Sequence, residues 1–132
     1  MRLRLLDAVL TPACVLLLAL AAPHVAETGV PPRLVAAVSY VEARCDLDTP
    51  PGGHGEVGPF QVLPSHVRNR VLVRHCGGDL RLTRVNVCWG VHLLRKAYTR
   101  ARGDWRQALR HFYNGHGDPQ YWQKIKRALV SQ

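Results

Sequence analysis

The chain contains no internal repeat and no low-complexity segment, which excludes solenoids and other repeat architectures. Strand patterns, in which apolar and polar residues alternate, are scarce, whereas apolar residues recur at helical spacing through most of the sequence. The 132 residues suffice for one domain that buries a usable core without many disulfides or a metal. We therefore expect a single, mainly α-helical domain.

The chain also has no apolar run long enough to read as an ordinary membrane-spanning helix. The most apolar stretch is "VLLLALAA" (Val15–Ala22), and Asp7 and Pro12 interrupt the sequence before it. A spanning helix needs about 20 apolar residues. This stretch therefore indicates a shorter, targeting type of segment.

A secretory signal has a basic start, a short apolar run and small residues before its cleavage site. Arg2 and Arg4 provide the basic start, and "ALA" (Ala19–Ala21) fits a cleavage site. We expect residues 1–26 to be a signal peptide, with an uncleaved N-terminal anchor as the alternative, and residues 27–132 to form the domain. The protein is then exported to the periplasm or cell envelope.

Acidic residues are scarce: nine Asp and Glu stand against 18 Lys and Arg, which gives a net charge of +9. Such a surface attracts polyanions, among them nucleic acids and the anionic bacterial envelope. The alternative is an arginine-rich surface that serves solubility alone. The basic residues form no consecutive block, and no nucleic-acid recognition motif is present. We expect no nucleic-acid partner.

The cysteines show no C-x-x-C spacing. The expected mature chain retains Cys45, Cys76 and Cys88, an odd number that permits one disulfide and one free thiol, with the pairing left open. Cys76 and Cys88 also lie near His75 and His92, and zinc accepts both ligand types. Because exported cysteines more often oxidise, we expect no metal site.

The helical pattern is punctuated by glycine, proline and aspartate. Four glycines and two prolines make Thr49–Gly58 a long loop. Asp104 and Asp118 have the residue type and position of helix N-caps. The expected helices run from Pro31 to about Cys45, from Pro64 to about Arg74, from Thr83 to Arg100, from Trp105 to about Phe112, and from Pro119 onward.

Glu42 follows Leu34, Val38 and Val41 on the apolar stripe of the first of these helices. Burial and the negative end of the helix dipole both raise the pKa of a carboxyl group. A glutamic acid that stays protonated near neutral pH can donate its proton as a general acid. The alternative is a residue at the edge of the stripe whose carboxylate lies in water.

Four segments in order extend this interpretation: "YVEARCDL", "GEVGPFQVLP", "NVCWGVHLL" and "LRHFYNGHG". Together they resemble the successive motifs of the soluble lytic transglycosylase catalytic domain, a lysozyme-like family related to goose-type lysozyme. The family pattern is a catalytic Glu, then Gly-hydrophobic-Met-Gln-x-x-Pro, Asn-x-x-x-Gly, and a Tyr-Asn-x-Gly turn. The resemblance covers about residues 31–130 and implies a lysozyme-like helical domain with a long glycine-rich loop.

The resemblance also implies roles for particular residues. Glu42 matches the catalytic acid, and Tyr113 matches the tyrosine whose hydroxyl orients it. The implied substrate-binding residues, which line the cleft or hold the N-acetyl sugar, are Gly58, Phe60, Gln61 and Asn114.

The implied substrate is peptidoglycan, and the implied reaction needs one carboxylate and no cofactor or metal. Glu42 protonates the oxygen between N-acetylmuramic acid and N-acetylglucosamine, and then takes a proton from the 6-hydroxyl as a 1,6-anhydro ring closes. A hydrolytic muramidase and a weakly active peptidoglycan-binding relative are the alternatives. We expect a monomer.

Three residues depart from the family pattern. Ala43 replaces the usual Ser after the catalytic Glu, Cys45 replaces an aromatic, and Phe60 replaces the usual Met. These changes resemble those of small specialised transglycosylases in secretion, conjugation or phage systems.

Glu56 is the candidate for a second catalytic carboxylate. If its side chain faced the cleft, it could activate water and make the enzyme a hydrolase. Because loops are usually exposed, we expect Glu56 to face solvent.

Overall fold

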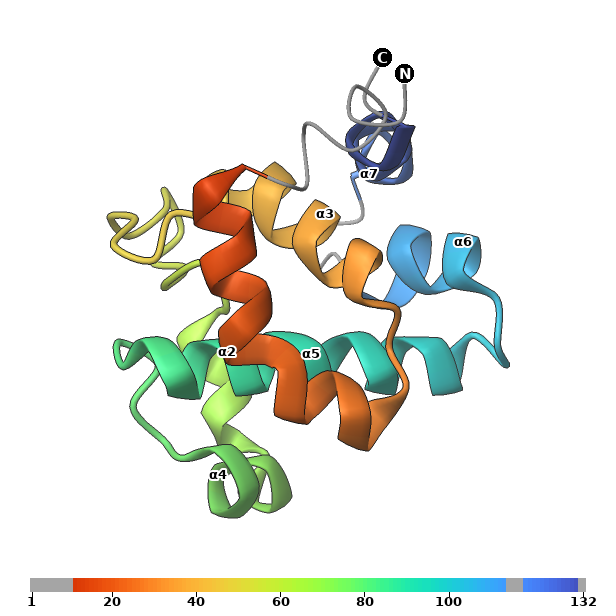
Figure 1. Ribbon diagram of the computed structural model, residues 1–132. Coiled ribbons are helices and arrows are strands. Elements are labelled where there is room, and N and C mark those ends of the chain that lie inside the picture. The colour runs from red at the N-terminus through yellow and green to blue at the C-terminus, as the bar shows by residue number, and fades with distance from the viewer. Residues whose placement is uncertain (1–10, 114–117, 131–132) are drawn as a thin grey trace.

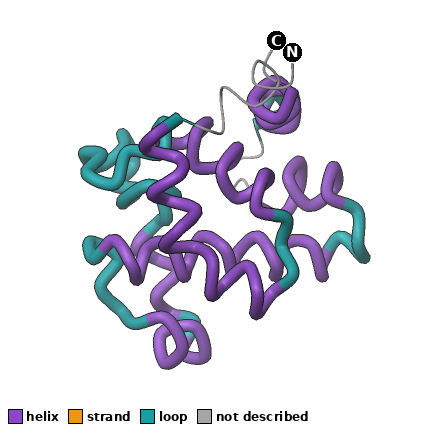
Figure 2. Tube along the Cα trace, in the orientation of Figure 1, coloured by secondary structure: helices purple, strands orange, loops and turns teal. Residues whose placement is uncertain are grey.

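The structure, a computed structural model, describes residues 11–113 and 118–130, and these residues are mainly helical (Figures 1 and 2). Outside the helices, one isolated bridge pairs Val57 with Val62. The predicted fold class, mainly α with a long glycine-rich loop, is confirmed. The elements are α2 (Pro12–Thr28), α3 (Pro32–Ala43), the 3-10 helix η1 (Pro64–Arg68), α4 (Arg70–Cys76), α5 (Thr83–Arg100), α6 (Trp105–Gln107), the π-helix η2 (Ala108–Tyr113) and α7 (Tyr121–Val130).

Helix α5 is the centre of the packing. It runs along the molecule in Figure 1, with α2 crossing it and η2 and α4 packed beside it. Half of its residues are buried, including Val87, Trp89, Val91 and Leu94. The indole Nε1 of Trp89 donates a hydrogen bond to the Gly77 carbonyl at 2.8 Å, so this large side chain leaves no polar group unpaired. Helix α3 packs between α2 and α7.

The predicted boundaries are most accurate where local signals are strong. Helix α5 spans the predicted Thr83–Arg100. Asp104 caps α6, since its Oδ1 accepts the Gln107 N–H at 3.1 Å. The predicted helix from Pro64 is instead divided, because Asn69 is extended and caps α4 by accepting the Leu72 N–H at 3.1 Å. Asp118 caps the turn that precedes α7, which begins at Tyr121 rather than at the predicted Pro119.

Helix α2 lies in the segment that the sequence assigns to a signal or anchor. Cys14, Leu17 and Ala21 face the core and have no exposed surface. Their spacing of three and four residues places them on one face of a helix. An apolar run of this length can also form a packed helix, and three residues of the segment expected to be a signal or anchor lie in the core of the described structure. The division into residues 1–26 and 27–132 stays a prediction. Export remains a prediction. Within the described ranges, no helix combines the length and apolarity needed to cross a membrane.

All four cysteines form disulfides, so the predicted free thiol is wrong. Cys14 pairs with Cys45 and Cys76 pairs with Cys88. The sequence prediction counted only the three cysteines of the expected mature chain and so did not pair Cys14. The first bridge fastens the start of α2 to the residues that follow α3, and the second fastens α4 to α5.

Replacement of both Cys14 and Cys45 by serine should destabilise the domain. The bridge closes a loop of 31 residues, and its loss should lower the free energy of unfolding by roughly 3–4 kcal/mol through chain entropy. Urea unfolding followed by circular dichroism measures the change. If the double variant unfolds at the wild-type urea concentration, α2 is not held to the domain as described.

Candidate active site

A cleft of about 140 Å³ lies between α3, the glycine-rich loop, α5 and η2. Helix α3 contributes Glu42 at its last turn. The remaining lining comes from the loop and the segment that follows it, from α5 and from η2: Glu56, Phe60, Gln61, Val62, Leu63, His66, Leu93, Lys96, Ala97, Arg100, Phe112 and Tyr113. Apolar walls, two carboxylates and several basic groups thus converge on one space.

Glu42 is a partly buried carboxyl group that receives a hydrogen bond. The hydroxyl of Tyr121 donates to Glu42 Oε2 at 2.6 Å. Burial is the main reason that the pKa of Glu42 is raised, and the nearby carboxylate of Glu56 acts in the same direction, while Tyr121 and Lys124 oppose it. A raised pKa keeps the proton on Glu42 to higher pH, which is what its predicted role as a general acid requires.

Helix α3 ends immediately after Glu42 for a conformational reason. Arg44 and Cys45 both adopt left-handed backbone conformations, with φ of 54° and 59°. The Arg44 N–H bonds back to the Ser39 and Tyr40 carbonyls, which closes the helix. The carboxyl group of Glu42 is consequently presented from a fixed helix end.

Tyr121 is a site residue that the sequence did not reveal. It lies on the buried stripe of α7 with Ile125 and Ala128, and is 5% exposed. A tyrosine hydroxyl on a buried stripe requires a polar partner, and this is the signal that could have identified it. Its ring stacks on that of Tyr113, with 6.3 Å between centroids and 25° between planes. Burial raises the pKa of both tyrosine hydroxyls, so both stay protonated.

The loop that forms one wall of the cleft is fixed by a buried amide. The Nδ2 group of Asn86 donates to the Val57 carbonyl at 2.8 Å and to the Leu80 carbonyl at 3.0 Å. Its Oδ1 accepts the Phe60 N–H at 3.1 Å. On the other side, the buried Ser39 hydroxyl of α3 donates to the Pro59 carbonyl at 2.7 Å. Helices α3 and α5 therefore both hold the loop by buried hydrogen bonds.

Two glycines allow this close approach. Gly58 has φ of 76°, and a Cβ there would overlap the Asn86 side chain. Gly90 lies one turn beyond Asn86 on α5, and a Cβ there would overlap the Phe60 ring. The Asn-x-x-x-Gly pattern thus has a physical meaning: the amide binds the loop and the glycine admits the ring.

The structure places the other predicted site residues as follows. Phe60 lines the base of the cleft and is 1% exposed. Gln61 lines the cleft with φ of 47°, and its Nε2 donates to the Gly58 carbonyl at 3.0 Å. Tyr113 also lines the cleft. Gly58 contacts Asn86, and Asn114 lies outside the described residues.

Glu56 does not face solvent as expected. It lines the same cleft as Glu42, and its side chain is 18% exposed. Its Oε1 accepts the His54 N–H at 2.7 Å, and its Oε2 lies 3.7 Å from His54 Nδ1. The tight loop around Gly52 turns the carboxylate inward, because a bare glycine leaves room for the Glu56 and Gln61 side-chain ends.

The fold and this cleft agree with a comparison against protein families. The model of the transglycosylase SLT domain matches residues 21–131, and the chain belongs to this family, the lytic transglycosylases of the lysozyme-like superfamily. The match begins inside α2 and confirms the resemblance seen in the four sequence segments. It also assigns the chain a peptidoglycan-acting function of the lytic transglycosylase type. Searches of curated proteins and of solved structures found no match.

Replacement of Tyr121 by Phe should move the pH profile of activity to higher pH. The hydrogen bond from Tyr121 lowers the pKa of Glu42, so its removal raises that pKa further. An acid catalyst loses activity as the pH rises through its pKa, and the alkaline limb of kcat/KM should shift upward. The lost hydrogen bond should also cost about 1–2 kcal/mol of stability.

Tyr98→Phe is the matched control, since it removes a tyrosine hydroxyl from α5 outside the cleft lining. An alkaline limb that stays in place in Tyr121→Phe, or that moves equally in Tyr98→Phe, would contradict the role of Tyr121.

Proposed function

We propose that this domain is a peptidoglycan lytic transglycosylase that cleaves the β-1,4 bond between N-acetylmuramic acid and N-acetylglucosamine without water. The observation that carries the proposal is Glu42 itself. It is a partly buried carboxyl group with a raised pKa, hydrogen-bonded by Tyr121, at the wall of a cleft in a lytic transglycosylase fold. These are the properties of a general acid that waits for its substrate in the protonated form.

In the first step, Glu42 gives its proton to the glycosidic oxygen as the bond from that oxygen to the anomeric carbon breaks. The bonding pair leaves with the N-acetylglucosamine oxygen, and the substrate's own N-acetyl group supports the positive charge on the muramic acid. The Tyr121 hydroxyl keeps its hydrogen bond to the carboxylate that forms. This bond strengthens as the charge develops, because charge-assisted hydrogen bonds are stronger than neutral ones.

In the second step, the ionised Glu42 takes the proton of the muramic acid 6-hydroxyl. The oxygen then bonds to the anomeric carbon and closes the 1,6-anhydro ring, which returns Glu42 to its protonated form. Gln61 and Asn114 are proposed to hold the sugar, and Tyr113, whose ring stacks on that of Tyr121, to help orient the acid. Phe60, which is buried, and Gly58 give the loop its shape.

A muramidase is the second candidate function, and the position of Glu56 favours it. A carboxylate in the same cleft as the acid could take a proton from water, which would then attack the anomeric carbon in place of the 6-hydroxyl. The two reactions differ in one product feature: an anhydro end or a reducing end. A glycan-binding relative with weak activity is the remaining alternative, and Ala43 in place of the usual Ser is the departure that favours it.

A second groove, of about 430 Å³, supports adhesion to an anionic wall. It lies between α3 and α7 and is lined by Tyr40, Val41, Arg44, Lys124, Arg127 and Ala128. Arg44 lies over the Tyr40 ring, 4.6 Å from its centroid. Three basic groups and no acidic residue line this groove, and we propose that it contacts the acidic groups of the cell wall. We also propose that the protein is exported to the cell envelope and acts there as part of a secretion, conjugation or phage assembly.

Digestion of purified sacculi tests the reaction. We expect the wild-type protein to release muropeptides ending in 1,6-anhydro-N-acetylmuramic acid, detected by mass spectrometry, and Glu42→Gln to release none while keeping its circular dichroism spectrum. Activity that survives in Glu42→Gln would remove this acid from the mechanism.

Glu56→Gln, digested in parallel, separates the two candidate reactions. A transglycosylase should keep its anhydro products in this variant. Reducing-end products from the wild type, heavier by one water and lost in Glu56→Gln, would establish the muramidase instead.

Binding of the inactive Glu42→Gln protein to sacculi tests the basic groove. Adding Arg44→Gln and Arg127→Gln should weaken cosedimentation, and added salt should weaken binding by screening the same charges. Arg70→Gln on α4, which does not line the groove, is the matched control. If only the control variant loses affinity, or if salt has no effect, the groove does not bind the wall.

A further inference from the structure

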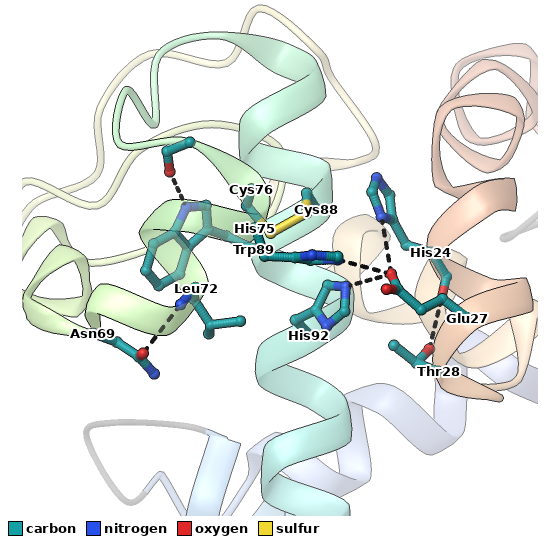
Figure 3. The surroundings of a disulfide bond; sticks show 11 residues. His24, Glu27, Thr28, Asn69, Leu72, His75, Cys76, Cys88, Trp89 and His92 are labelled. Carbon is teal, nitrogen blue, oxygen red and sulfur yellow. Dashed lines mark hydrogen bonds and ion pairs between the residues drawn. A yellow bond between two sulfur atoms is a disulfide. The ribbon is translucent and has the colours of Figure 1, made fainter.

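Three histidines surround one carboxylate on the side of α5 where α2 and α4 meet it (Figure 3). His24 and Glu27 come from the last turns of α2, His75 from the end of α4, and His92 from the middle of α5. None of these four residues lines the catalytic cleft. The cluster is therefore separate from the proposed reaction.

The three imidazole rings converge on one oxygen atom of the Glu27 carboxylate. Glu27 Oε1 lies 2.9 Å from His75 Nε2, 3.1 Å from His92 Nε2 and 4.0 Å from His24 Nδ1. The ligand atoms of Glu27, His75 and His92 all lie within 4.8 Å of one another. Tetrahedral zinc, with bonds of about 2.0–2.1 Å, needs its ligand atoms roughly 3.4 Å apart. The two distances from Glu27 Oε1 to the imidazole nitrogens of His75 and His92 already lie close to that spacing.

The Cys76–Cys88 disulfide holds the histidines in place. His75 precedes Cys76, and His92 lies one turn after Cys88, so the bridge that joins α4 to α5 also sets these two rings side by side. Their centroids are 4.7 Å apart in an edge-to-face arrangement, and the His24 ring lies 5.8 Å from that of His92 in a similar one. The disulfide thus preorganises two of the nitrogen atoms.

The chemistry of the cluster suits a divalent metal of the zinc type. Imidazole nitrogen and carboxylate oxygen are both zinc ligands, and imidazole must be neutral to bind. The side chains of Glu27 and His75 remain 45% and 43% exposed, so an ion can reach them from solvent.

We propose that Glu27, His75 and His92 bind one Zn²⁺ ion, with His24 as the fourth ligand, and that the ion fastens α2 to α4 and α5. The sequence predicts no metal site, and the zinc site that it offers as an alternative combines His75 and His92 with Cys76 and Cys88. Because those cysteines are bonded to each other, they cannot be the ligands, and α2 supplies the other two instead. This proposal does not depend on the proposed function.

Titration of tag-free, EDTA-treated full-length protein with ZnCl₂ tests the site by calorimetry. We expect one equivalent of bound zinc, and at least about tenfold weaker binding in both His75→Ala and His92→Ala. Zinc at a hundredfold excess over Kd should also raise the Tm of the wild type by about 5 °C or more.

His111→Ala is the matched control, because His111 is an exposed histidine of η2 outside the cluster, and it should bind zinc as the wild type does. If His92→Ala does not fold, the more exposed His75→Ala decides. Absence of binding to the wild type, or binding that is unchanged in His75→Ala, would overturn the proposal.

Discussion

The cleft depends on the buried side chain of Asn86. Its amide accepts the Phe60 N–H and donates to the carbonyls of Leu80 and Val57, and the Val57 carbonyl also accepts the Val62 N–H. Each such group left unpaired would cost about 1–3 kcal/mol. The amide holds the loop against α5, where Gly90 leaves room for the Phe60 ring, and the next residue, Gln61, lies at the cleft wall. A motif of the family is in this way a requirement of packing.

The same packing explains why the pKa of the Glu42 carboxyl group is raised. Glu42 is held at the end of α3 between the loop and α7, where burial favours its neutral form and Tyr121 favours its ionised form. The two influences oppose one another, and burial is the larger. The pKa of Glu42 is therefore raised above its ordinary value, and the Tyr121 hydroxyl is already in place as a donor to the ionised form. The carboxylate of Glu56 in the same cleft also raises the pKa of Glu42. It therefore favours the protonated form of Glu42 whether or not it activates a catalytic water.

Features set by neighbouring residues were predictable from the sequence, and features set by distant ones were not. Asp104 caps α6 and α5 keeps its predicted bounds because capping and periodicity are local. The partner of Glu42 lies 79 residues away in sequence, and nothing near Tyr121 indicates which group its hydroxyl meets. The inward turn of Glu56 likewise depends on a loop conformation that glycine content alone does not specify. The burial of Glu42 and its raised pKa were predictable because its place on the apolar stripe near the helix end follows from its own helix.

Helix α2 shows how one composition supports two interpretations. A run of leucine and alanine after a basic start fits a leader, yet its inner face fills the core while Val15 and Leu16 stay largely exposed. Because much of its apolar surface is not buried, hydrophobic packing alone specifies its position weakly. The helix is instead attached at both ends. Cys14 in its first turn is bonded to Cys45, and Glu27 in its last turn meets His75 and His92. The first attachment depends on oxidation of the two cysteines, and the second on contacts of the Glu27 carboxylate with two imidazoles. The stability of α2 should therefore depend on whether its surroundings are oxidising.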